Sequence, residues 1–162
     1  MLECSDDAEL ALLKLKGTAV YDEKRLTAPE QRLVKKQMKC GTLRGRILAS
    51  FITAVSGTAT ARRRAIEELR ACCHIVREHT WAACYMSEAI MFLAGREVCD
   101  EVFLRFAIRG LGSRRREARV NAAGTLAEYA RMGNLSVRNA LLSATRDRDA
   151  AVRSNARRGL AK

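Results

Sequence analysis

The chain has 162 residues, of which 48% are hydrophobic and 30% charged, and it carries a formal net charge of +12 at pH 7. This length fits a single domain that buries about two-thirds of its unfolded surface. One proline, ten glycines and an apolar fraction rich in alanine and leucine argue against an all-β chain and against extended disorder. We therefore predict an all-α fold.

The N-terminal segment differs from the rest in charge. Residues 1–22 contain five acidic side chains and two lysines, which gives a net charge of −3. A short helix is expected from Asp6 to Lys16, ending at Gly17. The Thr-Ala-Val-Tyr stretch that follows is also compatible with an extended arm, because Thr and Val are β-branched. We predict an acidic arm or short helix over residues 1–25 and one helical repeat domain over residues 26–162.

Capping residues define the next two helices. Thr27 is expected to cap a helix with Pro29 in its first turn and Glu30 at the capping-box position, and Gly41 ends it. Thr42 opens a second helix, and the Ser-Gly-Thr sequence at residues 56–58 closes it. The apolar side chains of this second helix fall at helical spacing and form one stripe: Leu43, Ile47, Phe51, Ile52 and Val55.

The middle of the chain contains the most apolar segment. A helix over residues 59–76 is expected to bury Ile66, Leu69, Cys73 and Val76. Residues 80–94, which include WAACYMSEAIMFLA, are predicted to form a central core helix, because so short an apolar run does not span a bilayer. Four further helices are expected to form two antiparallel pairs, over residues 98–111, 113–132, 134–145 and 147–160.

The C-terminal part of the chain contains an internal repeat. Residues 114–126 align with residues 148–160 at an offset of 34 positions. A period of this size indicates helical hairpins that stack on one another, because each hairpin needs its neighbours to bury its apolar face. An ordinary helical bundle without true repeats is the alternative. Five aligned pairs are identical: Arg114/Arg148, Arg119/Arg153, Asn121/Asn155, Ala122/Ala156 and Leu126/Leu160.

The second copy resembles a known family. The string LLSATRDRDAAVRSNARRGL, residues 141–160, resembles a HEAT repeat: an apolar helix end, a turn with Asp, then a helix that opens with Val-Arg. The resemblance implies a HEAT/armadillo-like, right-handed α-solenoid of about four helical hairpins. It also implies that the turn and helix residues pair and stack with their equivalents in neighbouring repeats. This structural ladder comprises Asp147, Arg119, Arg153, Asn121 and Asn155.

The preceding copy departs from the family pattern. Ser113 replaces the turn Asp, and Ala118 replaces the Val. Neither copy has the proline often found in the first helix of these repeats. The resemblance is clearest over residues 103–160.

The C-terminal half is strongly basic. Residues 105–162 contain fourteen basic and four acidic side chains, a net charge of +10. A clustered positive field favours partners with phosphates or acidic surfaces, although solvated charged faces are the alternative. Three consecutive arginines at a helix opening oppose the helix dipole without an evident folding reason, and no aromatic residues accompany them. The predicted basic surface comprises Arg114, Arg115, Arg116, Arg146, Arg148, Arg157 and Arg158.

Six cysteines raise the question of disulfides or metal. The acidic N-terminus lacks the basic and apolar regions of a signal peptide, so we expect an intracellular protein with reduced thiols. Cys72, Cys73, His74 and His79 resemble a zinc cluster. Consecutive helical residues point about 100° apart, however, and these could converge only with help from Cys84 or Cys99. We expect no metal and no cofactor.

The sequence contains no recognisable catalytic motif. It has two histidines, no Gly-rich phosphate loop and no nucleophile with an obvious base. We predict a non-catalytic scaffold that docks into a larger assembly through its Arg-rich C-terminal half. The expected partner is a protein with an acidic surface or a second copy of the chain, and neither a membrane nor a small-molecule substrate is expected. RNA contact within a ribonucleoprotein such as a ribosome is the main alternative, and a HEAT-like nucleic-acid enzyme is another.

The final hairpin carries one more expectation. Only Ala161 and Lys162 follow Leu160 in this sequence. We expect the last helix to expose a strip of apolar side chains that a partner would cover.

Overall fold

The computed structural model describes residues 6–22, 24–77 and 80–161, and within these ranges the chain forms helices and turns with no strand. The all-α prediction is therefore confirmed for this part of the chain. The residues cluster into two compact units, Met1–Ile75 and Val76–Lys162. Each unit has its own central helix.

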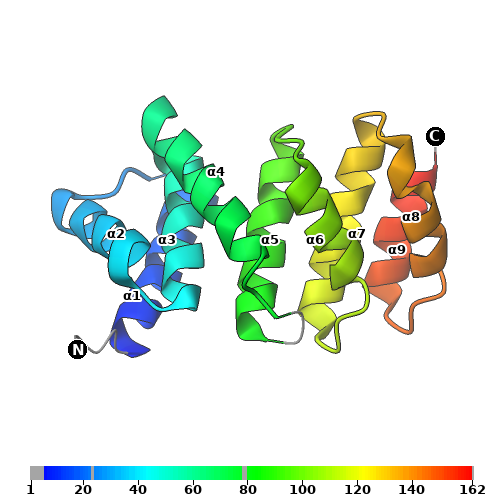
Figure 1. Ribbon diagram of the computed structural model, residues 1–162, viewed down its shortest axis with the longest axis horizontal. Coiled ribbons are helices and arrows are strands. Elements are labelled where there is room, and N and C mark those ends of the chain that lie inside the picture. The colour runs from blue at the N-terminus through cyan, green and yellow to red at the C-terminus, as the bar shows by residue number, and fades with distance from the viewer. Residues whose placement is uncertain (1–5, 23, 78–79, 162) are drawn as a thin grey trace. The chain divides into compact units, whose positions relative to one another are not determined.

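The first unit is organised around α3. Its elements are α1 (Asp6–Lys16), a π-helical turn (Gly17–Tyr21), α2 (Ala28–Cys40), α3 (Leu43–Ser56) and α4 (Ala59–Cys73). Helices α1, α2 and α4 all pack on α3 (Figure 1). The predicted apolar stripe of α3 lies in the core except for Leu43, which is half-buried, and the neighbouring Leu48 and Ala49 are also fully buried.

Helices α2 and α3 start after threonine N-caps, where the sequence predicts them. The Glu30 carboxylate accepts a hydrogen bond from the backbone N–H of Thr27 at 2.6 Å, as in a capping box. This bond lowers the pKa of Glu30. Thr42 Oγ1 accepts one from the N–H of Gly45 at 3.1 Å. Helices α2 and α3 end directly before Gly41 and Gly57, as predicted.

Two details of the first unit differ from the prediction. The segment Gly17–Tyr21 is a π-helical turn and not an extended arm. Burial of Ala19 and Val20 against α3 outweighs the β-propensity of this stretch. Helix α4 ends at Cys73, and Ala65 takes the buried position next to a half-buried Ile66.

The second unit is organised around α7. Its elements are α5 (Trp81–Gly95), α6 (Glu101–Gly110), α7 (Arg116–Arg131), a 3-10 turn (Leu135–Val137), α8 (Arg138–Ala144) and α9 (Ala150–Leu160). Helix α7 packs between α5 and α9 and also contacts α6, while α8 packs mainly on α9 (Figure 1). Helices α6 and α7 form one hairpin, and α8 and α9 form the next.

Small residues allow the helices of the second unit to approach closely. A Cβ added at Gly110 would lie 3.1 Å from Ala122 Cβ, and one added at Gly159 would lie 2.8 Å from Ala127 Cα. The buried core of these hairpins includes Leu104, Ala107, Ala123, Leu126, Tyr129, Val137, Leu141, Val152 and Ala156.

The last four helices of the second unit start later than predicted, and α8, expected from residue 134, begins at Arg138 after the 3-10 turn. The expected starts at residues 98, 113 and 147 each lie three positions before the observed starts at Glu101, Arg116 and Ala150. The intervening residues form turns. Asp100 and Asp149 cap the helices that follow, each accepting from two backbone N–H groups.

Tyr129 links the two helices of the first hairpin. Its side chain is fully buried, and its hydroxyl donates to the backbone carbonyl of Asp100 at 3.0 Å. The same oxygen accepts from the backbone N–H of Asp100, also at 3.0 Å. The start of α6 is thereby fixed against the last turns of α7.

Candidate binding edge at two adjoining turns

The turns that precede α7 and α9 repeat the same hydrogen bonds at an interval of 34 residues. In the first turn, Ser113 Oγ accepts a hydrogen bond from the backbone N–H of Arg115 at 3.2 Å. In the second, Asp147 Oδ1 accepts one from the N–H of Asp149 at 2.8 Å. Ser113 thus replaces the turn aspartate in this hydrogen bond, because hydroxyl and carboxylate oxygens can both accept from the N–H two residues later.

Arg119 and Arg153 stabilise these turns in the same way. Arg119 Nη1 donates to the backbone carbonyls of residues 113 and 114 at 3.0 and 3.3 Å. Arg153 Nη1 donates to the carbonyls of residues 147 and 148 at 2.8 and 2.9 Å. Arg153 therefore meets Asp147 through the backbone carbonyl and not through the carboxylate. Each guanidinium ties its own helix to the turn before it.

Two ion pairs join the first turn to the second. Arg119 Nε donates to Asp147 Oδ2 at 3.0 Å, and Arg119 is only 5% exposed. Arg116 Nε donates to Asp149 Oδ2 at 2.6 Å. The two turns therefore lie side by side. We refer to residues 113–116 and 146–149 together as the turn edge.

Asn155 lies on the face of α9 that meets α7. Asn155 Nδ2 donates to the backbone carbonyl of Val120 at 3.1 Å. Asn121 is half-buried, and its carbonyl accepts from Thr125 Oγ1 at 2.9 Å. Asn155 thus satisfies a backbone group of α7 and fixes the register of the two helices.

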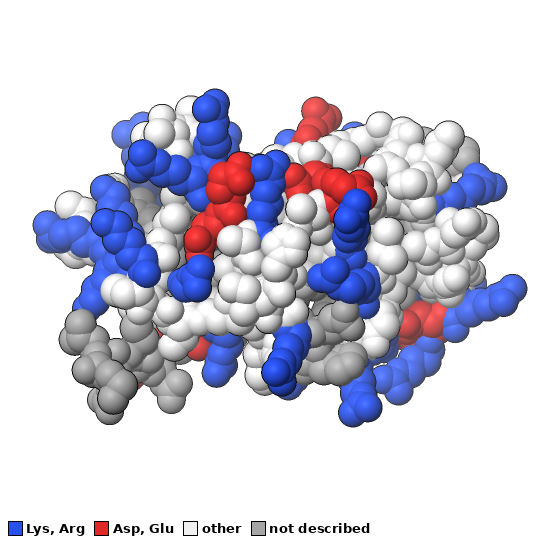
Figure 2. All heavy atoms as spheres, viewed as in Figure 1, with Lys and Arg blue, Asp and Glu red and all other residues white. Residues whose placement is uncertain are grey.

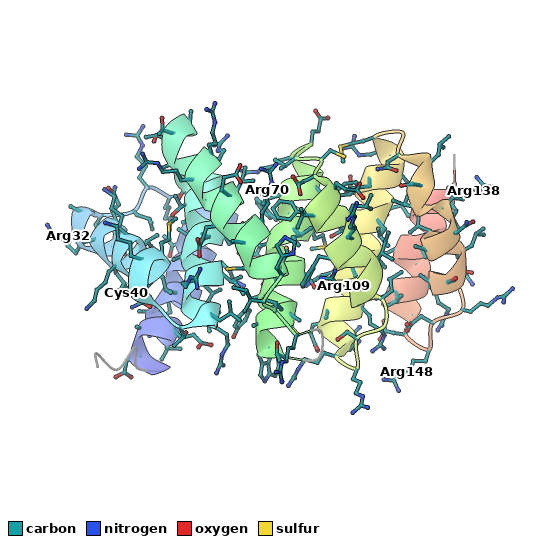
Figure 3. The ribbon with its side chains drawn as sticks, viewed as in Figure 1. Arg32, Cys40, Arg70, Arg109, Arg138 and Arg148 are labelled. Atoms are coloured by element: carbon teal, nitrogen blue, oxygen red, sulfur yellow. The ribbon has the colours of Figure 1, made fainter. Side chains whose placement is uncertain are left out.

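The turn edge gathers five of the seven arginines expected to form the basic surface. Arg114, Arg116, Arg146 and Arg148 are exposed there, and Arg115 is half-buried. Five arginines against two aspartates give the edge a net charge of +3. Figure 2 shows basic side chains along this side of the second unit with carboxylates among them, and Figure 3 shows Arg148 projecting from it.

Two of these arginines have a folding role that the sequence does not reveal. The opening of α7 places Arg116 beside the Asp149 carboxylate. The guanidinium of Arg115 lies over the ring of Trp81, 4.1 Å from the ring centroid. The ion pair and the cation–π contact offset the unfavourable position of these charges at a helix N-terminus.

Trp81 is the functional candidate that sequence reasoning missed. It is the first residue of α5 and remains 49% exposed, although it contacts Arg115. The expectation that no aromatic residue accompanies the arginines is therefore wrong. The available signal was a lone tryptophan just after the capping residue Thr80, a position where a side chain reaches the helix end.

Arg157 and Arg158 lie away from the turn edge. They occupy the last turns of α9, whereas the edge lies at its start, about 12 Å away at the helical rise of about 1.5 Å per residue. Both are exposed, and Arg158 Nη2 lies 3.6 Å from Glu128 Oε1. The structure therefore divides the predicted basic surface between two ends of α9.

The five cysteines of the described ranges are not joined in disulfides. Cys72, Cys73 and Cys84 are buried, while Cys40 and Cys99 are exposed. Burial raises the pKa of the Cys72 thiol to about 11 and also raises that of Cys84. Such thiols are protonated at neutral pH and react slowly. Cys4 and His79 lie outside the described residues.

The described ranges contain neither a metal-binding cluster nor a membrane-spanning helix. No group of three or more His, Cys, Asp or Glu side chains in these ranges is placed to hold a metal ion. None of the helices in this part of the chain has both the length and the apolar character needed to cross a membrane.

Comparison of the chain with protein-family models, with curated proteins and with solved structures gave no match in any of the three.

Proposed function

We propose that this chain is a non-catalytic interaction module that joins a larger assembly through the turn edge. The observation that carries the proposal is the charge of that edge. Arg116 and Arg119 are engaged with Asp149 and Asp147, whereas Arg146 and Arg148 are exposed and pair with no acidic side chain among the described residues. Their charge is available to a partner.

The fold type is part of the same proposal. The 34-residue recurrence of the Ser113 and Asp147 turns, with Arg119 and Arg153 in matching positions, supports a HEAT/armadillo-like α-solenoid for residues 113–160. A right-handed superhelix of about four hairpins remains our prediction for the whole chain. Solenoids of this kind present their turns as rows of exposed loops, which suits an interaction role.

The partner that fits best is a protein with an acidic surface. In the second turn Asp147 and Asp149 each follow an arginine, so the charges of residues 146–149 alternate in sign. A continuous row of phosphates would meet repulsion at these carboxylates. An acidic protein surface can place its carboxylates against the arginines alone, which gives specificity as well as attraction.

Charge reversal tests this proposal. The double variant Arg146→Glu with Arg148→Glu changes the net charge by −4 without removing any ion pair within the described residues. We expect it to lose association with the native assembly by a factor of about a hundred, because two repulsive contacts replace two attractive ones. The measurement is co-purification of the tagged full chain from its native source, with nuclease present.

The matched control is Arg63→Glu with Arg64→Glu. These two residues are exposed on α4 in the first unit and also form no ion pair with the described residues. We expect this control to retain the assembly. Equal retention by both double variants, with unchanged circular dichroism, contradicts the proposal.

Trp81 supports RNA as a second candidate partner. An exposed tryptophan beside an arginine can stack on an unpaired base while the guanidinium contacts phosphate. Because Trp81 is the only tryptophan of the sequence, its fluorescence reports directly on this position. Saturable quenching by single-stranded RNA, weakening log-linearly with salt, would favour RNA. Loss of the native association on nuclease treatment would do the same.

A further inference from the structure

The outward face of α9 is basic, not apolar. The apolar residues Val152 and Ala156 are fully buried, because they pack into the core formed with α7 and α8. The strip of exposed apolar side chains expected from the sequence is therefore absent from α9. On its outer face the exposed residues are Ala150, Ser154, Arg157, Arg158 and Ala161.

The face of α7 that packs against α9 can be compared with the equivalent face of α9, one repeat later. The backbone carbonyl of Val120 on this face of α7 accepts a hydrogen bond from Asn155. At Gly124, on the same face, an added Cβ would lie 3.6 Å from Asn155 Nδ2. One repeat later, the equivalents of these two positions are Ser154 and Arg158. Arg157 likewise replaces the buried Ala123. Helix α9 therefore has arginines at two of these three positions, where α7 has Ala123 and Gly124.

Arg119, the equivalent of Arg153 one repeat earlier, shows which chemical group binds an arginine at this position of the repeat. Its Nη1 is held by the turn carbonyls, so its Nε faces the next turn, where it donates to Asp147 Oδ2 at 3.0 Å. The pair is well shielded, with side-chain exposures of 7% and 15%. The ligand of this guanidinium is a carboxylate from the adjoining hairpin.

Arg153 makes the same contacts to backbone carbonyls as Arg119. Its Nη1 is fixed by the carbonyls of residues 147 and 148, as Arg119 is fixed by those of its own turn. It is half-buried, and no acidic side chain of the described residues forms an ion pair with it. The fixed guanidinium costs little further entropy when it binds, which favours a carboxylate at its Nε.

We propose that the outward face of α9 binds an acidic helical segment of a partner protein. One carboxylate of that segment is bound by Arg153 as Asp147 is bound by Arg119, and another lies against Arg157. Ala150 and Ser154 are short enough to let a helix approach between them. This surface adjoins the turn edge at Arg153, whose Nη1 contacts the carbonyls of residues 147 and 148, and runs along α9 to Arg157. It uses neither Arg146 nor Arg148, so the inference goes beyond the proposed function and does not rest on it.

A carboxylate partner fits this face better than a nucleic acid. The template within the same molecule is a carboxylate held at a single Nε. Arg158 is drawn toward Glu128, so only part of the face is free for an anion. A polyphosphate chain would need a continuous basic track, whereas an acidic helix presents carboxylates one turn apart, matching residues 153 and 157.

The test uses the full chain labelled with ¹⁵N and follows the arginine Nε–Hε resonances. The probes are a short poly-L-glutamate peptide and a single-stranded oligouridylate of equal charge. We expect the peptide to shift the signals of Arg153 and Arg157 saturably. Arg153→Gln should weaken the peptide about tenfold, the effect of one lost charge-assisted hydrogen bond.

Arg153 also stabilises the turn before α9, so its substitution can weaken binding by disturbing the fold. A second variant and a control separate the two effects. Arg157→Gln removes an exposed side chain with no ion pair among the described residues, and should weaken the peptide about threefold without changing thermal stability. Arg138→Gln, at the start of α8 and exposed (Figure 3), should leave binding unchanged.

Several results would overturn the inference. Shifts confined to Arg146 and Arg148 would place binding at the turn edge, which leaves the proposed function intact and rejects this one. Tighter binding of oligouridylate than of the peptide at Arg153 and Arg157 would reject an acidic protein partner. Equal affinity of the peptide for the wild type and for Arg157→Gln would show that Arg157 of α9 does not contact the peptide, which contradicts the inference.

Discussion

Arg119 donates from Nε to Asp147 Oδ2 at 3.0 Å, and this contact fastens the turn before α9 to the start of α7. The same guanidinium also satisfies two backbone carbonyls of its own turn. Arg153, one repeat later, has the equivalent backbone contacts but no carboxylate partner among the described residues. Arg119 therefore binds both its own turn and the carboxylate of the next turn, whereas Arg153 binds only its own turn within the described residues.

Arg119→Ala is expected to destabilise the protein by about 3 kcal/mol, because it leaves Asp147 Oδ2 and two turn carbonyls without the Arg119 donor in a shielded site. Arg153→Ala should cost only about 1 kcal/mol, since just two partly exposed carbonyls lose their donor. Urea denaturation of both variants checks the difference. Equal losses would contradict the view that the interturn ion pair is the larger contribution.

The ends of α5 and α7 provide a second matched pair. Glu97 has a φ of 64° and Gly133 a φ of 87°, and in each case the next residue donates back into the preceding helix, Val98 to Leu93 and Asn134 to Tyr129. Left-handed backbone is unfavourable for a residue with a Cβ. Glu97→Gly should therefore raise the free energy of unfolding by about 1 kcal/mol.

The reverse change, Gly133→Ala, should lower the free energy of unfolding by about 1 kcal/mol, because no steric contact lies within 4 Å of the added Cβ and only backbone strain changes. Thermal melts of both variants measure the effect. Opposite signs support the assignment of strain at Glu97, and a loss of stability in Glu97→Gly rejects it.

At Gly159, α9 lies close to α7. A Cβ at this position would lie 2.8 Å from both Ala127 Cα and Leu141 Cδ1. Gly159→Ala should destabilise the second unit by about 2 kcal/mol, because α9 must move away from a backbone atom. Gly95→Ala is the control: no contact lies within 4 Å, and the helix gains about 0.5 kcal/mol of propensity. Calorimetric melting should move in opposite directions for the two variants.

The ion pair of Asp149 predicts a dependence on pH. The hydrogen bond from Arg116 is the main cause that lowers the pKa of Asp149 from its ordinary value of 3.8. A lowered folded-state pKa stabilises the protein above pH 3.8, and this contribution is lost as the pH falls through the folded-state pKa.

The variant Asp149→Asn keeps a side-chain oxygen that can cap α9 but removes the charge. It should be less stable than the wild type at pH 7, and the gap should narrow as the pH falls below about 4. Urea denaturation of both proteins over this range measures the gap. A difference independent of pH would attribute the loss to the cap alone.

Helix boundaries could be predicted from the sequence where a cap and a stop signal are local. Thr27 with Glu30, and Gly41 after Cys40, define α2 because each signal acts within one helical turn. The internal repeat likewise identified Arg119 and Arg153 as equivalent, which their shared carbonyl contacts reflect. Local signals and internal symmetry require no knowledge of the tertiary packing.

Contacts between segments far apart in the sequence could not be predicted. The stacking of Arg115 on Trp81 and the pairing of Arg116 with Asp149 each join residues more than thirty positions apart. The orientation of α9 was also missed. Its apolar stripe was identified, but the sequence does not tell which neighbours cover that stripe, so its outer face was expected to be apolar.

The central claim is that the turn edge contacts a protein, and a photo-crosslinker placed beside it tests this most directly. Ser143 is exposed in the last turn of α8, and its carbonyl accepts from the N–H of Arg146 at 3.2 Å. Ser143→p-benzoylphenylalanine in the full chain, irradiated in its native source, should give a discrete adduct that resists nuclease and is destroyed by protease. Thr60→p-benzoylphenylalanine, next to Arg63 and Arg64, should give none. An adduct removed by nuclease, or the same adducts from both positions, would contradict the account.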